Sequence, residues 1–171
     1  MKKIISLIIF TFILSCFNLG FAAPDEQTVI SSFQEVIQKH LDSYQDDPRI
    51  MVYYVPSDTY WIKSKCIVSN DYTYDIQKTN SIITPYTGYF IYKMRISTID
   101  KQPTKEAAEA FNTFNKNGDR LPVNCRITFS YQGDKWIPQK YEIQSLISDK
   151  WYDVTNDTSD AVMYQRILIK K

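Results

Sequence analysis

The spacing of apolar residues changes at about residue 50, and this change constrains the fold more than any other feature of the chain. Before it, apolar residues recur at three- and four-residue steps, which is typical of one face of an α-helix. These residues are Val29, Ile30, Phe33, Val36, Ile37 and Leu41. After it, apolar and polar residues alternate, most clearly over 123–131, as expected for strands with one buried face. The pattern predicts an α+β fold, with an N-terminal amphipathic helix packed on a curved antiparallel sheet.

Turn-forming residues divide the alternating region into about five to six strands, with one further short helix that Thr104 would cap. Asn70 and Asp71 are predicted to break or bulge the sheet, and 132–135 to form a tight hairpin turn. Pro138 indicates an edge or a bulge in its strand, because proline has no N–H to donate. Strands are expected at 51–55, 60–68, 72–77, 86–99, 123–131 and 136–147, with a weaker candidate at 162–169.

The first 22 residues have the pattern of a secretory signal peptide. Lys2 and Lys3 precede an uncharged apolar run, and small residues follow it. Cleavage after Ala22 fits best and leaves 23–171 as a single exported domain, periplasmic or secreted.

Two alternatives to simple secretion remain open. The stretch 13–16 resembles a bacterial lipoprotein box, in which Cys16 would carry the lipid. The stretch 4–23 has no charged residue and is long enough to remain as a membrane anchor. Either alternative would attach the domain to a membrane.

Export bears on the two other cysteines, Cys66 and Cys125. An even count in an oxidising compartment favours a disulfide between them, which would stabilise the fold by up to about 4 kcal/mol. The alternative is a pair of buried free thiols.

The charge and the motif content exclude several functions. Removing 1–22 leaves 18 basic against 19 acidic side chains, so the domain has no basic surface for nucleic acid. The four glycines are isolated, which excludes a phosphate-binding loop. The one histidine, His40, is expected to be partly packed at the end of the helix, and the sequence predicts neither a metal nor a cofactor.

The carboxylates in or near strands are candidates for acid–base chemistry. The sequence does not pair any two of them, and solvated strand and turn carboxylates are the favoured interpretation. They are Asp58, Asp71, Asp75, Glu142 and Asp153.

Tyrosine is abundant, with 13 residues, and tyrosines on an open sheet face provide rigid amphipathic contact area. Two interpretations remain open. The tyrosines can be ordinary sheet residues, because β-sheets favour aromatic side chains. Alternatively, they form a binding surface near the bend at 79–85, with Tyr72, Tyr74, Tyr86 and Tyr89 as the candidates. Gly88 is expected to mark a bulge or to leave space for a neighbouring ring.

The order of elements over about 25–155 resembles the cystatin-like and NTF2-like superfamily. That resemblance implies a cone-shaped domain used for dimers, ligand pockets, inhibitors and a minority of enzymes.

Three functions remain. The sequence favours an exported, non-catalytic domain that binds a protein or envelope component, and it leaves open that the domain forms a homodimer. The alternatives are a small enzyme or ligand-binding protein with a pocket in the concave sheet, using Asp75 or Glu142, and an inhibitor or immunity protein.

Overall fold

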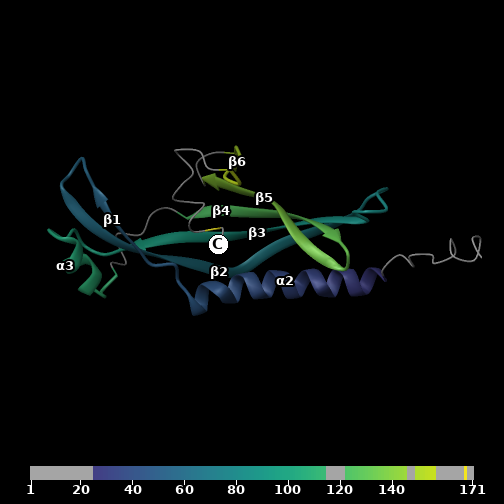
Figure 1. Ribbon diagram of the computed structural model, residues 1–171, viewed down its shortest axis with the longest axis horizontal. Helices are drawn as coiled ribbons and strands as arrows, with labels where there is room; N and C mark the ends of the chain where they lie inside the picture. Colours follow the sequence, from purple (N-terminus) through teal and green to yellow (C-terminus); the bar gives the residue numbers. More distant parts are fainter. Residues whose placement is uncertain (1–24, 115–121, 146–148, 157–167, 169–171) are drawn as a thin grey trace, which may run out of the picture.

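The computed structural model describes residues 25–114, 122–145, 149–156 and 168 (Figure 1). These residues form an α+β fold with one long helix, one short helix and a curled antiparallel sheet of six strands. The strands follow one another as a meander, in the order β1-β2-β3-β4-β5-β6. The elements are α2 (Glu26–Asp46), β1 (Met51–Val55), β2 (Tyr60–Lys78), β3 (Tyr86–Thr98), α3 (Lys105–Ala110), β4 (Val123–Gln132), β5 (Lys135–Ser145) and β6 (Tyr152–Asp153).

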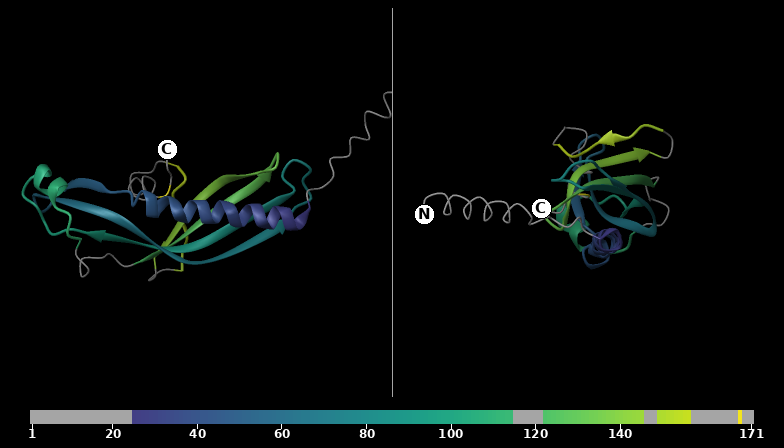
Figure 2. Two further views of the ribbon diagram at one scale, coloured as in Figure 1. Left: turned by 90° about the horizontal axis from the view of Figure 1, so that it is seen from below. Right: turned by 90° about the vertical axis from the view of Figure 1, so that its right-hand side faces the viewer.

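The long helix α2 lies along the hollow side of the curled sheet (Figure 2). Asp25 caps its first turn by accepting a hydrogen bond from the backbone N–H of Thr28 at 3.1 Å, as carboxylates do at helix N-termini. Four residues of the predicted apolar stripe, Val29, Phe33, Ile37 and Leu41, are buried, whereas Ile30 and Val36 are half-buried. The buried face of α2 continues to Tyr44, which the stripe did not include. Burial of this stripe against the sheet provides the main stabilisation of α2, because isolated helices are marginal in water.

Two irregularities help the sheet to curl. Three residues of β2 around Asn70 stand opposite Lys93 alone, so the predicted break is a bulge within one 19-residue strand. The insertion adds two residues to β2, and therefore the same face stays inward on both sides of it. A second bulge lies in β5 next to Pro138, as predicted. Bulges increase the local twist and bend of a strand.

The cap of α3 and the hairpin turn between β4 and β5 form where the sequence predicts them. Thr104 caps α3 by accepting from the backbone N–H of Ala107. Gly133 and Asp134 both have positive φ, the combination that a two-residue hairpin turn requires. At the C-terminal end of α3, the buried Lys63 ammonium donates to the carbonyls of Glu109 and Phe111.

The predictions for the two ends of the chain are mostly untested by the structure. The signal peptide, Cys16 and most of the candidate strand 162–169 lie outside the described residues. Leu168, the one described residue of that strand, is helical and buried, so the strand prediction is wrong there. Among the described helices, none has the length and apolarity that crossing a membrane requires.

Candidate functional site

The concave face of the sheet, where a pocket was one expectation, is filled by α2 over the helix's first half. The Phe33 ring lies between Phe129 and Trp136, with centroid separations of 5.5 and 4.4 Å. The Trp136 indole N–H donates to Ser32 Oγ at 3.1 Å. A Cβ atom on Gly88 would lie 3.1 Å from the tip of the Phe33 ring. Gly88 therefore makes space for a ring, which was one of the two roles expected for it.

Further along α2, the core contains a polar cluster. His40 Nε2 lies 3.0 Å from the Tyr92 hydroxyl, and the Arg49 guanidinium donates to the Tyr44 hydroxyl at 3.0 Å. Burial, and secondly the charge of Arg49, lower the pKa of His40 to about 4. Burial also raises the pKa of Tyr92 well above its ordinary value. These groups are neutral at physiological pH, apart from Arg49, and they form a hydrogen-bonded part of the core, as expected for a packed histidine.

The predicted disulfide is not formed. Cys66 and Cys125 are free and buried, and burial raises the pKa of the Cys66 thiol to about 11. Both cysteines are on the inner faces of their strands, but β3 runs between β2 and β4. Strands two places apart are separated by about 9.5 Å, whereas bridged Cα atoms lie within about 7 Å.

The two candidate catalytic carboxylates do not converge. Asp75 lies on β2 opposite Tyr89, and Glu142 lies on β5 opposite Arg126, so two strands separate them. Burial by itself would raise the pKa of Glu142, but hydrogen bonds from Arg126 at 2.7 Å and Lys140 at 2.8 Å outweigh it and lower that pKa. An ion-paired carboxylate of low pKa is a poor general acid, and the two cations hold Glu142 in the sheet.

The four candidate tyrosines do not form one exposed surface. Tyr86 is only 3% exposed and packs edge-on against Tyr131, so the expectation that it lies on an open rim is wrong. Tyr89 is half-buried on the outer face, and Tyr72 is half-buried against the core. Tyr74 is 38% exposed, and its hydroxyl accepts a hydrogen bond from Gln34 of α2 at 2.8 Å.

The loop between β2 and β3 contains a feature that the sequence reasoning missed. Ile82 and Ile83 are 92% and 77% exposed, more than the other large apolar side chains that are exposed in the described residues. Their neighbours in the loop are hydroxyl and amide side chains and Pro85. An apolar pair inside a run of turn-forming residues was the available signal, because turns normally place polar side chains in water.

Internal hydrogen bonds hold this loop in one shape. Thr79 N–H donates to Pro85 C=O at 2.8 Å, and the Thr79 hydroxyl donates to Thr84 C=O. Ser81 N–H donates to Thr79 Oγ1, and Thr84 N–H donates to Ser81 Oγ, each at 3.1 Å. The isoleucines therefore protrude from an ordered tip.

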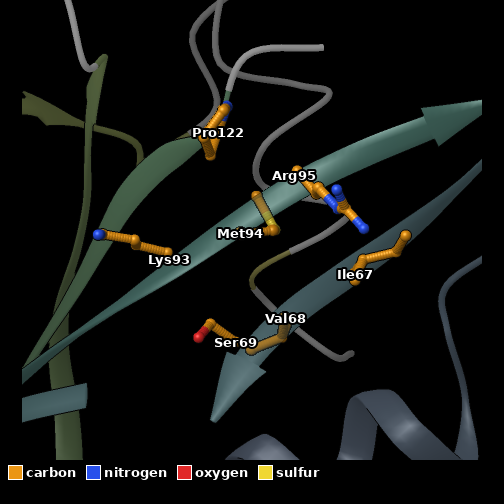
Figure 3. Close-up of a pocket in the computed structure, with 7 residues that line it drawn as sticks. All are labelled: Ile67, Val68, Ser69, Lys93, Met94, Arg95 and Pro122. Atoms are coloured by element: carbon orange, nitrogen blue, oxygen red, sulfur yellow. The ribbon is translucent and has the colours of Figure 1, made fainter. Parts of the chain in front are cut away.

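A shallow hollow of about 240 Å³ lies elsewhere, beside the bulge of β2 (Figure 3). It is smaller than typical ligand pockets of about 300–1,000 Å³, and it contains no His, Cys or carboxylate. Its lining residues are Ile67, Val68, Ser69, Lys93, Met94, Arg95 and Pro122.

Comparison of the chain with protein-family models, curated proteins and solved structures finds no match in any of the three. Within the described ranges, His, Cys, Asp and Glu side chains form no group of three that could hold a metal ion. The candidate functional site is therefore the loop 79–85, which we call the isoleucine tip.

Proposed function

We propose that this protein is an exported, non-catalytic accessory domain that attaches to a hydrophobic component of the cell envelope through the isoleucine tip. The observation that carries the proposal is the exposure of Ile82 and Ile83 on a hydrogen-bonded loop. Exposing apolar side chains in water is unfavourable, and two adjacent ones on an ordered protrusion are typical of a contact site.

Export is part of the same proposal, and the signal-peptide pattern of residues 1–22 supports it. Removal of that segment would make α2 the first element of the mature domain. The order of elements resembles the cystatin-like and NTF2-like superfamily, whose members include dimers, ligand pockets, inhibitors and a minority of enzymes, and a binding role is one that this resemblance implies.

Site-specific photo-cross-linking tests the proposal. Benzoylphenylalanine would replace Ile82 in the full chain, and a matched variant would carry it in place of Ile137, which is 40% exposed on β5. In producing cells, we expect the exported protein to cross-link from the tip and not from the control position. Equal yields from the two positions would contradict the proposal.

A further inference from the structure

The isoleucine tip has three properties that together select its partner. It is a small convex protrusion, it has no charged side chain, and it lies at one particular end of the elongated domain. We propose that the tip inserts Ile82 and Ile83 into the surface of a phospholipid bilayer. This inference rests on the proposed function and names the envelope component.

The size and shape of the tip favour a bilayer over a protein surface. A specific protein interface buries about 800 Å² on each partner, and two protruding isoleucines with hydroxyl neighbours provide only a small part of that area. A bilayer accepts a convex apolar group without shape complementarity, and isoleucine is among the residues that partition best into its core.

The chemistry of the loop allows insertion to a shallow depth. None of its seven residues is charged, so no ionised group would have to leave water. The backbone N–H groups of Thr79, Ser81 and Thr84 already have partners within the loop. This lowers the cost of moving the backbone toward an apolar phase, where unsatisfied donors are expensive.

The tip lies at the same end of the molecule as the start of α2, from which an N-terminal membrane anchor would extend. The β2–β3 loop and the start of α2 lie together at one end of the molecule in two views (Figures 1 and 2). Only Pro24 and Asp25 separate the uncharged stretch 4–23 from α2, and that stretch is retained as an anchor if residues 1–22 are not removed. If Cys16 carries lipid, the eight residues 17–24 between it and Asp25 can span up to about 29 Å, and the lipid would extend from the end of the molecule at which the tip lies (Figures 1 and 2).

The charges at this end have mixed sign, with Lys78 beside the loop and Asp25 and Glu26 at the start of α2. We therefore expect apolar insertion, rather than attraction to lipid charge, to provide the affinity. Two isoleucines alone give weak, reversible binding, and stable attachment requires a second anchor. Zwitterionic and anionic vesicles should bind about equally.

Vesicle flotation tests the inference. The full chain is expressed with its leader, and the exported product is purified and its processing determined by mass. It is then floated with vesicles of phosphatidylcholine, or of phosphatidylethanolamine and phosphatidylglycerol. The double variant Ile82→Ser/Ile83→Ser is compared with Ile50→Ser/Ile137→Ser, whose two isoleucines are 50% and 40% exposed elsewhere. We expect the tip variant to partition at least about tenfold less and the control variant to be unchanged.

A second measurement reports insertion directly. Cys66 and Cys125 are buried, and in a product whose mass shows Cys16 removed or lipidated an environment-sensitive dye can be placed on Ile82→Cys alone, with Ile137→Cys as the matched control. We expect a blue shift and quenching by lipid-borne nitroxide at the tip only.

The outcomes separate this inference from the proposed function. Equal flotation of the wild type and the tip variant would overturn bilayer insertion. An absence of flotation, combined with specific protein cross-links from position 82, would overturn it and leave the proposed function standing. An absence of both would overturn both.

Discussion

Gly88→Ala tests the close contact between the sheet and α2. The new Cβ would lie 3.1 Å from Phe33 Cζ and 3.2 Å from the carbonyl oxygen of Asp75. The Phe33 ring is held by Phe129 and Trp136, so it has little freedom to retreat. Overpacking of this kind costs about 1–3 kcal/mol. Because Gly88 does not have a positive φ, alanine recovers about 0.4–1 kcal/mol through the unfolded state.

We therefore expect Gly88→Ala to lower the free energy of unfolding by about 1–2 kcal/mol, measured by urea denaturation with an unchanged m-value. A second background, Phe33→Leu, removes the ring atom that the Cβ meets. There the same substitution should cost about 1 kcal/mol less, because residues in contact are not additive.

Gly133→Ala is the matched control. Gly133 has no atom within 4 Å of the added Cβ, but its φ is 52°, so alanine there costs about 1 kcal/mol through backbone strain. That cost should be the same in both backgrounds. An equal loss for Gly88→Ala in both backgrounds, or a gain in stability, would refute the assignment of Gly88 as the space for the Phe33 ring.

Three further predictions concern buried polar groups. Lys63→Met should lower the free energy of unfolding by about 1–3 kcal/mol and speed amide exchange in α3, because the carbonyls that the ammonium caps lose a donor. Lys105→Met, on the exposed face of α3, is the control and should change stability by less than about 0.5 kcal/mol. Equal effects of the two substitutions would contradict the capping role. The pKa of His40 in the folded protein is lowered from 6.5 to about 4. The stability that comes from keeping His40 neutral is therefore present above pH 6.5 and is lost as the pH falls to about 4. Urea titrations should show a loss of about 2–3 kcal/mol over that range, which His40→Gln should reduce; an identical pH profile in the variant would exclude His40 as the cause. Cys66 and Cys125 should resist alkylation until the protein unfolds and then both react, as followed by intact mass; a native mass lower by two hydrogens would instead show a disulfide.

The sequence was sufficient to predict those features that depend on residues close together in the chain. Periodicity predicted α2 and the long strands, because it records which side chains face the core. The capping residue Thr104, the hairpin turn at Gly133 and the bulge beside Pro138 were also predicted, since each follows from local hydrogen bonding and allowed backbone angles.

The burial of Tyr86 was predictable from the sequence. Its position places it in phase with the buried Phe90 and Tyr92 of the same strand, and continuing the alternation to the strand's first residue would have placed it in the core. The exposure of Ile82 and Ile83 was not predictable in this way, because their apolar character alone does not show whether another element covers them.

The sequence by itself therefore determined α2, α3 with its cap, most of the strands, the hairpin turn, and the inward direction of Cys66 and Cys125, because these depend on local periodicity and local hydrogen bonding. Tertiary structure alone decided that β3 separates the two thiols, that α2 fills the concave face, and that two strands separate Asp75 from Glu142. It also decided that nothing in the described residues covers most of Ile82 and Ile83. The physical reason is that strand order and coverage depend on contacts between residues far apart in the chain, which local spacing does not record.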